Sequence, residues 1–290
     1  MPELPEVEVA ARNLRRWMSG RKIRGVEPRE GSTRLFRPAK PEAMEALNGT
    51  RFQDIRRVGK NLLLTFASRT GPIGLWSHLG MTGKWVRRAP DAPEPPFARF
   101  LIELDDRVSL YYTDTRIFGR LRLVPAAAFE ELGEIAALGP DPLTDGIDAR
   151  ALHAKLATVS KAIKVAIMDQ ALLPGIGNIQ AVEGLYRAGI DPRRPARSLS
   201  QAEVNHLRQG LLDSIEFTLA SFATAGSDGD SRDISYVEER RGDNPFLVYG
   251  REGEPCPRCH QGKKPGKAAG TITRIVQAQR ATFFCPACQK

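Results

Sequence analysis

The chain has 290 residues, a hydrophobic content of 41% and a formal net charge of +9. This length suits two domains with a small appendage, and the composition is typical of proteins that bury real cores. No apolar run is long enough to cross a bilayer, and Glu3 and Glu6 occupy the place of a signal peptide, so we expect no membrane and a cytoplasmic, nucleoid-associated protein. The positive charge favours a polyanionic partner, most simply nucleic acid.

The first residues carry three groups with reactive potential. If Met1 is removed, Pro2 ends the chain as a secondary amine, and an α-amino group has a pKa of about 7.7–8.0, so part of it is unprotonated near neutrality. Such an amine can attack a sugar or carbonyl carbon and form a Schiff base, which from proline is a charged iminium. Glu3 and Glu6 place two carboxylates beside it. The alternative is an ordinary helix start, with proline in the first turn and carboxylates facing the helix dipole.

The first half of the chain reads as one helix followed by β-structure. Apolar residues recur every three or four positions from Val7 to Met18 and predict a helix that ends near Gly20. Short runs rich in β-branched and aromatic residues then alternate with turn residues, which predicts a sandwich or barrel. The expected strands are Arg51–Phe66, Ile73–Trp76, Lys84–Arg88, Phe100–Leu104, Val108–Thr113 and Leu121–Val124.

The pattern becomes helical after Pro125 and stays so to about Phe222, with Glu134–Asp145 as an inter-domain linker. The sequence Ser-Gln-Ala-Glu at 200–203 is a capping box that opens a helix. The following segment, Ala225–Arg232, has the composition of a mobile loop.

Three polar residues lie at turns, and one of them, Asn178, is a candidate for a contact to an anion. Lys60 precedes an apolar strand, His78 lies in a glycine-punctuated turn, and Asn178 follows the Gly-x-Gly turn of Gly175–Gly177. Amides at a helix start bind anions, and glycine allows a phosphate to approach closely. The ordinary alternatives are a solvated lysine, a structural histidine and a turn between two helices.

Two further segments carry side chains suited to extruding a base from a duplex. Met81 lies in Ser77–Gly83, and Arg116 and Phe118 lie in Asp114–Gly119. Apolar wedges unstack DNA, and an arginine can hydrogen-bond the base left behind. The sequence alone does not indicate whether these two segments meet.

Four cysteines near the C-terminus form two C-x2-C pairs. This is the ligand set of a tetrahedral zinc site, although the loop Gly262–Gly270 makes the spacing longer than in a usual zinc ribbon. Two disulfides are the alternative, and an intracellular location disfavours them. We therefore predict one structural, closed zinc site made by Cys256, Cys259, Cys285 and Cys288.

The segment that begins at the first cysteine holds seven Lys or Arg residues and no Asp or Glu. Ile272, Ile275 and Val276 predict the core of a small strand. A two-stranded ribbon that presents Arg280 to a phosphate would fix register without reading sequence. The alternative is an exposed arginine with no partner.

Taken together, these motifs resemble the formamidopyrimidine-DNA glycosylase / endonuclease VIII family of bifunctional DNA repair enzymes. The resemblance covers nearly the whole chain in order. It implies an α+β multidomain protein with an N-terminal β-sandwich, a helical helix–two-turns–helix domain and a C-terminal four-cysteine zinc finger, divided at 1–133, 134–250 and 251–290. The matching motifs are PELPEVE, GKNLLL, SHLGMTG, YTDTRIFGRL, LGPDPL, LLPGIGNI, AGIDPRR, VYGREGEPC and QRATFFCPAC.

The resemblance also implies a role for each matching residue. Pro2 would be the nucleophile at the sugar C1′, with Glu3 as proton donor or acceptor and Glu6 in support of that chemistry. Lys60 would be a further catalytic residue, which lies against the lesion phosphates and assists the reaction. His78, Asn178, Tyr249 and Arg280 match positions that contact phosphates. Met81, Arg116 and Phe118 match the triad that fills the void left by the extruded base, in the form typical of the oxidised-purine branch. The sequence departs from the family at Ile117, where an arginine is common, and at Ala225–Asn244.

We therefore expect a monomeric glycosylase with AP-lyase activity that acts on double-stranded DNA containing a damaged base or an abasic site. The expected lesions are 8-oxoguanine and formamidopyrimidines, removed through a Schiff base on Pro2 with β,δ-elimination of the abasic strand. One alternative is an oxidised-pyrimidine glycosylase of the endonuclease VIII type. Another is a zinc-containing DNA-binding protein without catalysis.

Overall fold

The computed structural model describes residues 2–224, 244–260 and 270–290, and they divide into two compact units. The first unit comprises Met1–Ala136 and Phe222–Tyr236, and the second comprises Ala137–Ser221 and Val237–Lys290. Of the segments singled out in the sequence, Ala225–Arg232 lies outside the described residues, as do nearly all of Ala225–Asn244 and Gly262–Gly270. The α+β class is confirmed, and the zinc finger belongs to the same unit as the helical segment.

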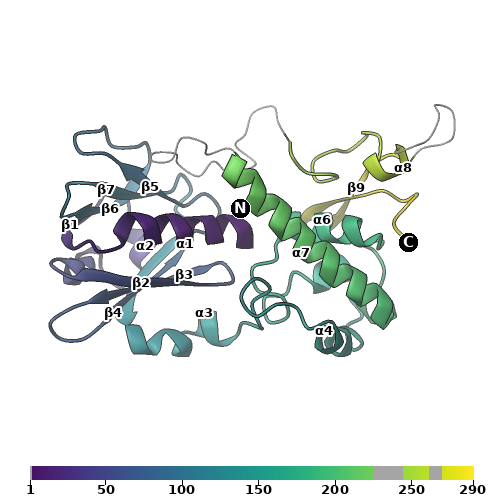
Figure 1. Cartoon of the computed structure of the whole chain (residues 1–290), viewed down its shortest axis with the longest axis horizontal. Helices are drawn as coiled ribbons and strands as arrows, with labels where there is room; N and C mark the ends of the chain where they lie inside the picture. Colours follow the sequence, from purple (N-terminus) through teal and green to yellow (C-terminus); the bar gives the residue numbers. More distant parts are fainter. Residues whose placement is uncertain (1, 225–243, 261–269) are drawn as a thin grey trace. The chain divides into compact units, whose positions relative to one another are not determined.

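The first unit is a sandwich of two four-stranded sheets, in which all the paired neighbours are antiparallel (Figure 1). One sheet has the order β1-β6-β7-β5 and the other the order β2-β3-β4-β8. The strands are β1 (Ile23–Pro28), β2 (Arg51–Val58), β3 (Asn61–Ala67), β4 (Ile73–His78), β5 (Lys84–Arg88), β6 (Ala98–Leu104), β7 (Ser109–Thr113) and β8 (Arg120–Pro125). The helical elements described in this unit are the long α1 (Leu4–Met18) and the short α2 (Thr33–Phe36), η1 (Pro41–Leu47), η2 (Ala126–Glu131) and α3 (Gly133–Ala136).

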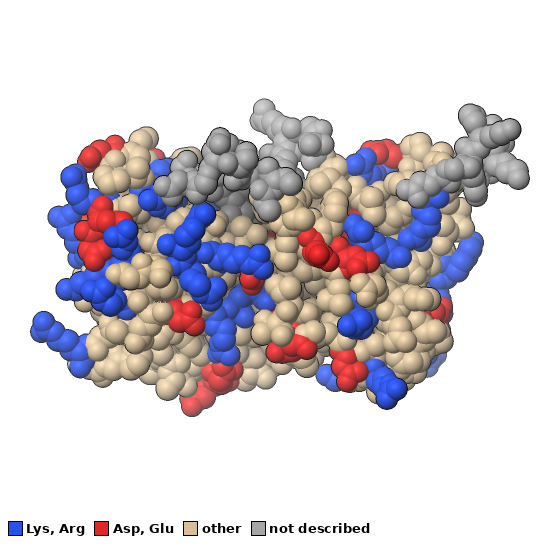
Figure 2. Space-filling view, in the orientation of Figure 1, with Lys and Arg blue, Asp and Glu red and all other residues tan. Residues whose placement is uncertain are grey.

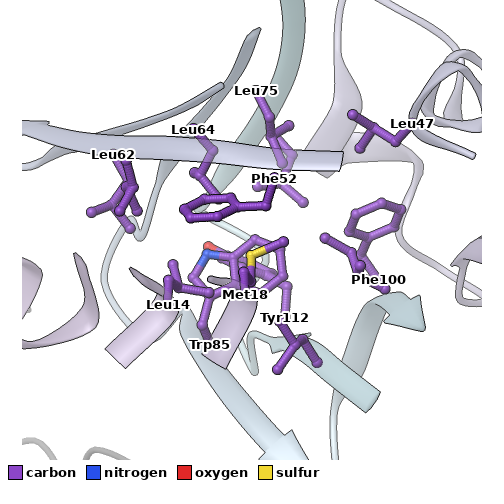
Figure 3. Close-up of a cluster of buried hydrophobic side chains, with 14 of the residues drawn as sticks. Leu14, Met18, Leu47, Phe52, Leu62, Leu64, Leu75, Trp85, Phe100 and Tyr112 are labelled. Carbon is purple, nitrogen blue, oxygen red and sulfur yellow. The ribbon is translucent and has the colours of Figure 1, made fainter. Parts of the chain in front are cut away.

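Helix α1 is part of the hydrophobic core of this unit. Its apolar residues, including Leu14 and Met18, are fully buried in one cluster with side chains from both sheets. Figure 3 shows these two side chains among Phe52 of β2, Trp85 of β5 and neighbouring residues. Burying a side chain of this size stabilises a protein by roughly 1.5–3 kcal/mol, so packing fixes the position of the helix more firmly than its intrinsic propensity does.

The described part of the second unit is mainly helical. Its long helix α7 (Gln201–Thr224) begins at the predicted capping box, where the Glu203 carboxylate accepts a hydrogen bond from the Ser200 amide at 2.7 Å. Helix α6 (Asn178–Ala188) ends at Gly189, which adopts a left-handed conformation. The other helical elements are α4 (Ala149–Leu156), α5 (Ile163–Ala166) and η3 (Ala196–Ser198).

The zinc-finger segment carries α8 (Pro257–His260) and an antiparallel hairpin of β9 (Thr273–Gln277) and β10 (Arg280–Phe284). It docks onto the end of α6, because the Gln289 side chain donates to the Ile190 carbonyl at 2.8 Å. The Lys290 amide also donates to the Gly189 carbonyl at 2.9 Å. The predicted core position of Val276 is wrong: this side chain is 63% exposed, whereas Ile272 is buried.

Positive charge is prominent on the surface. In the orientation of Figure 2, Lys and Arg side chains gather over the sandwich unit on the face in view. Among the described residues, no helix is long and apolar enough to span a membrane.

Candidate functional site

The N-terminal residues lie at the buried start of α1. Glu3 is the N-cap residue, and Glu3 and Glu6 are only 2% and 3% exposed. The Glu6 carboxylate accepts a hydrogen bond from the Glu3 backbone N–H at 3.0 Å, which is one half of a capping box. Pro2 is buried beside them. The structure therefore holds three of the four predicted catalytic residues in one ordered turn, and the fourth, Lys60, lies in the turn between β2 and β3.

Glu6 is in an environment that disfavours its charge. Burial, and secondarily the negative charge of Glu3, raise the pKa of Glu6 to about 7. A carboxyl group with a pKa near the working pH can both hold and release a proton. Paired carboxyl groups in such surroundings are typical of sites that perform acid–base chemistry.

The turn that carries Lys60 is tied to α1 by an ion pair. Glu8 of α1 accepts a hydrogen bond from Arg57 Nε at 2.9 Å, and Arg57 Nη1 donates to the Gly59 carbonyl at 3.0 Å. The Arg57 side chain is only 2% exposed. These successive hydrogen bonds fix the backbone just before Lys60 relative to the helix that begins at Glu3.

His78 lies at the end of β4, in register with Asn61 of β3 and Arg120 of β8. Burial, followed by the positive charges of Lys60 and Arg120, lowers the pKa of His78 to about 4. Its Nδ1 accepts a hydrogen bond from the Gly80 amide at 3.1 Å. Since the ring is neutral at physiological pH, its proton is on Nε2, which is a donor suited to a phosphate oxygen.

The two segments proposed for base extrusion do meet. A Cβ atom added at Gly80, whose φ is +63°, would lie 2.5 Å from the carbonyl carbon of Phe118, so only glycine permits this approach. The Thr82 hydroxyl and Asp114 Oδ1 also form a hydrogen bond of 2.5 Å between the segments. Met81 is therefore carried by a loop that packs directly on the backbone at Phe118.

Two arginines lie over the ring of Phe118. The guanidinium of Arg116 is 4.7 Å from the ring centroid, and that of Arg34 of α2 is 5.4 Å from it. Cations at such distances are attracted to the ring face. The Phe118 ring and the two guanidinium groups thus place an apolar surface directly beside positive charge.

In the second unit, α6 and the β9–β10 hairpin bring the other predicted contacts together. Asn178, the first residue of α6, donates from Nδ2 to the Ala281 carbonyl at 2.9 Å, next to Arg280. The ring of Tyr249 packs edge-on against Phe283 of β10 at 5.2 Å. The buried start of α6 and the exposed Arg280 of the hairpin are thus joined by a direct hydrogen bond next to that arginine.

The four cysteines form one cluster, and their sulfur atoms all lie within 4.8 Å of one another. Their surroundings are tight, since a Cβ atom at Gly270 would lie 2.4 Å from Cys285 Sγ. Four thiolates at this spacing suit a tetrahedral zinc ion with no open position. The residues therefore fit a structural zinc.

Family models match three consecutive parts of the chain. The formamidopyrimidine-DNA glycosylase N-terminal domain matches residues 1–121, the formamidopyrimidine-DNA glycosylase H2TH domain matches 138–226, and the zinc finger found in FPG and IleRS matches 270–290. The chain belongs to the formamidopyrimidine-DNA glycosylase family. The family match and the cysteine cluster together identify one structural zinc ion as the metal.

Relatives of this family align with the whole chain. The chain is 40% identical to the formamidopyrimidine-DNA glycosylase of Laribacter hongkongensis and 37% identical to that of Desulfitobacterium hafniense, with full coverage of each pair. Its structure resembles the Lactococcus lactis Fpg in complex with DNA containing an abasic site, with a TM-score of 0.82, 29% identity and 99% coverage of both chains. A complex of a Lactococcus lactis FPG mutant with Fapy-dG DNA matches equally well.

Sequence reasoning missed Glu183, which organises the backbone of residues 247–249 in this glycosylase. Its carboxylate is fully buried and accepts hydrogen bonds from the amides of Leu247, Val248 and Tyr249 at 3.1, 2.9 and 2.9 Å. It thereby fixes the backbone of Tyr249, which lies outside any helix or strand. An acidic residue on the apolar face of the predicted helix was the available signal.

We predict that the glycosylase loses stability as pH rises through the titration range of Glu6. The folded state favours the protonated carboxyl, so its contribution is fully present below about pH 4.5 and is lost as pH rises to about 7. The shift corresponds to an effect on the order of 3 kcal/mol. Glu6→Gln, which mimics the neutral acid, should become more stable relative to the wild type across this range in urea titrations. A stability difference between the two proteins that is independent of pH would contradict this prediction.

Proposed function

We propose that the protein is a bifunctional DNA glycosylase and AP lyase that removes oxidised purines during base excision repair. The observation that carries this proposal is the buried turn that holds Pro2, Glu3 and Glu6 at the start of α1, in a chain of the formamidopyrimidine-DNA glycosylase family. A nucleophilic amine beside two carboxyl groups provides what a Schiff-base mechanism needs.

The reaction begins when the unprotonated Pro2 nitrogen attacks C1′ of the extruded nucleotide. The N-glycosidic bond breaks, the base leaves with the bonding electrons, and it takes up the proton that the Pro2 nitrogen loses on bonding to C1′. Glu3 protonates O4′ as the sugar ring opens, and the nitrogen lone pair forms the C1′ iminium. Loss of a C2′ proton then expels the 3′ phosphate, and a second elimination expels the 5′ phosphate. Water finally hydrolyses the iminium and frees Pro2.

The other site residues bind and shape the DNA. Lys60 and the neutral imidazole of His78 contact phosphates near the lesion from the sandwich unit. Asn178, Tyr249 and Arg280 form a second set of phosphate contacts. Such contacts fix register and carry no sequence information. Met81, Arg116 and Phe118 fill the space left by the extruded base.

The remaining assignments follow from this function. We assign catalysis to 1–133, duplex binding to 134–250 and the zinc finger to 251–290. The enzyme acts as a monomer on duplex DNA. Its net charge of +9 favours residence on the nucleoid in the cytoplasm.

A lesion panel with borohydride trapping tests the proposal. Duplexes with 8-oxoguanine opposite cytosine, formamidopyrimidine, thymine glycol and an abasic site should all be compared. We expect a covalent protein–DNA adduct and fastest turnover on the two purine lesions, with no adduct when Met1 is retained. Absence of an adduct on every substrate, with salt-sensitive DNA binding intact, would leave only the binding-protein alternative.

Oxidised pyrimidines belong in the panel for a specific reason. A structure of the Lactococcus lactis FPG with DNA containing an oxidised pyrimidine matches this chain with a TM-score of 0.82. Faster turnover on thymine glycol than on 8-oxoguanine would favour the endonuclease VIII type of specificity.

A further inference from the structure

A tyrosine of helix α6 touches one of the zinc ligands. The Tyr186 hydroxyl lies 3.4 Å from Cys256 Sγ, within hydrogen-bond distance for a sulfur acceptor. Tyr186 is 2% exposed and Cys256 is fully buried, so water does not compete for this contact. The bond joins the helical segment to the metal site, across two parts of the chain that are 70 residues apart.

The direction of this hydrogen bond follows from the other partner of the hydroxyl. The backbone N–H of Arg258 donates to Tyr186 Oη at 3.0 Å, so the oxygen already accepts one hydrogen bond. A cysteine that ligates zinc is a thiolate, which can only accept. The phenol proton therefore points at Cys256 Sγ.

The Arg258 side chain holds the tyrosine ring in place. Its guanidinium lies over the Tyr186 ring at 4.6 Å from the centroid, and its Nη2 donates to the Tyr186 carbonyl at 2.7 Å. A cation over the ring draws electron density from it and makes the phenol a better donor. The ring, the arginine and the thiolate thus form one connected group.

We propose that Tyr186 is a positioning residue of the zinc site, whose O–H···S hydrogen bond stabilises the Cys256 thiolate and slows the loss of zinc. Four thiolates give a zinc centre excess negative charge, and a buried donor offsets part of it. Hydrogen bonds to metal ligands commonly change metal affinity by about 10–100-fold. Because this hydrogen bond comes from α6, retention of the metal also depends on the packing of the zinc finger against that helix.

Zinc release from the intact protein tests this proposal. Tyr186→Phe removes one oxygen and keeps the ring beneath Arg258. We expect zinc to pass to an excess of 4-(2-pyridylazo)resorcinol about 10–100-fold faster than from the wild type. Tyr111→Phe, which changes a buried tyrosine of β7 in the sandwich unit, is the matched control and should release zinc at the wild-type rate. Equal release rates for Tyr186→Phe and the wild type would overturn the proposal.

Spectroscopy provides a readout that a loss of packing alone would not move. In the cobalt-substituted proteins, the sulfur-to-cobalt charge-transfer bands should shift in Tyr186→Phe and stay unchanged in Tyr111→Phe. If Tyr186→Phe does not fold, NMR spectroscopy of the wild-type protein loaded with the NMR-active cadmium isotope still tests the hydrogen bond. A scalar coupling between the Tyr186 hydroxyl proton and cadmium is expected, and a resolved hydroxyl proton without coupling would overturn the proposal.

Discussion

Base excision by the Glu3→Gln variant should be slower than that of the wild type by about 10²–10⁴-fold, the usual contribution of a positioned proton donor. Glutamine keeps the size and the hydrogen-bonding oxygen of the N-cap residue, so α1 should still begin at the same place. The variant loses only the proton that the opening sugar ring requires. Single-turnover kinetics on an 8-oxoguanine duplex measure the effect.

Two comparisons make this result specific. Glu45→Gln makes the same chemical change at an exposed position of η1 and should leave the rate unchanged. A duplex with a preformed abasic site bypasses base removal, so Glu3→Gln should still form a borohydride-trapped adduct through Pro2. If Glu3→Gln excises the base at the wild-type rate, the proton donor must instead be Glu6. The raised pKa of Glu6 makes it the other carboxyl group able to hold a proton.

Removal of zinc should unfold the finger and weaken DNA binding by tenfold or more. Structural zinc contributes about 10–16 kcal/mol to the folding of zinc-finger peptides, and the short hairpin has little core to replace it. Unfolding of the hairpin removes both Arg280 and the Ala281 carbonyl that orients Asn178. A charged hydrogen bond contributes about 1.5–3 kcal/mol, and about 1.4 kcal/mol is tenfold in affinity.

Fluorescence anisotropy with an abasic-analogue duplex measures the weaker binding after chelation or in Cys285→Ser. The salt dependence should also become shallower, by about 0.9 for each phosphate that the protein no longer neutralises. Zinc added back should restore the chelated protein but not Cys285→Ser. Full DNA affinity in protein shown to be free of zinc would contradict the assignment of Arg280 to the interface.

The sequence predicted those parts of the fold that local patterns determine. The apolar spacing from Val7 to Met18 predicted α1, because one face of that helix is buried along its whole length. The strand Lys84–Arg88 and the capping box at Ser200 were also correct in position. The zinc ligands followed from spacing, since two C-x2-C pairs are the usual signature of a four-thiolate zinc site.

One strand was missed and one core position was wrong, in places where neighbouring segments decide pairing and burial. Strand β1 (Ile23–Pro28) was not predicted, because its sequence IRGVEP contains glycine and charged residues and buries only Ile23 fully. It is a strand because β6 pairs with it. Val276 was placed in a core, yet it is exposed, since nothing in the described part of the chain covers that side chain.

Contacts between distant segments could not be predicted at all. Periodicity indicates that α6 is buried. It does not indicate that the Glu183 carboxylate accepts hydrogen bonds from the amides of residues 247–249, or that the Tyr186 hydroxyl contacts Cys256 Sγ. The pKa of Glu6 also depends on burial among residues far away in sequence. The sequence therefore proposes residues for the site, whereas the contacts that tune and hold them come only from the structure.

Chain termini usually loosen before the domain they belong to. Here the carboxyl groups at the beginning of α1 belong to the same helix as Leu14 and Met18, whose side chains are buried in the core of the sandwich. Warming the protein should therefore not inactivate it by gradual fraying of its first turn. Catalysis should instead disappear in a single step, when the sandwich itself melts.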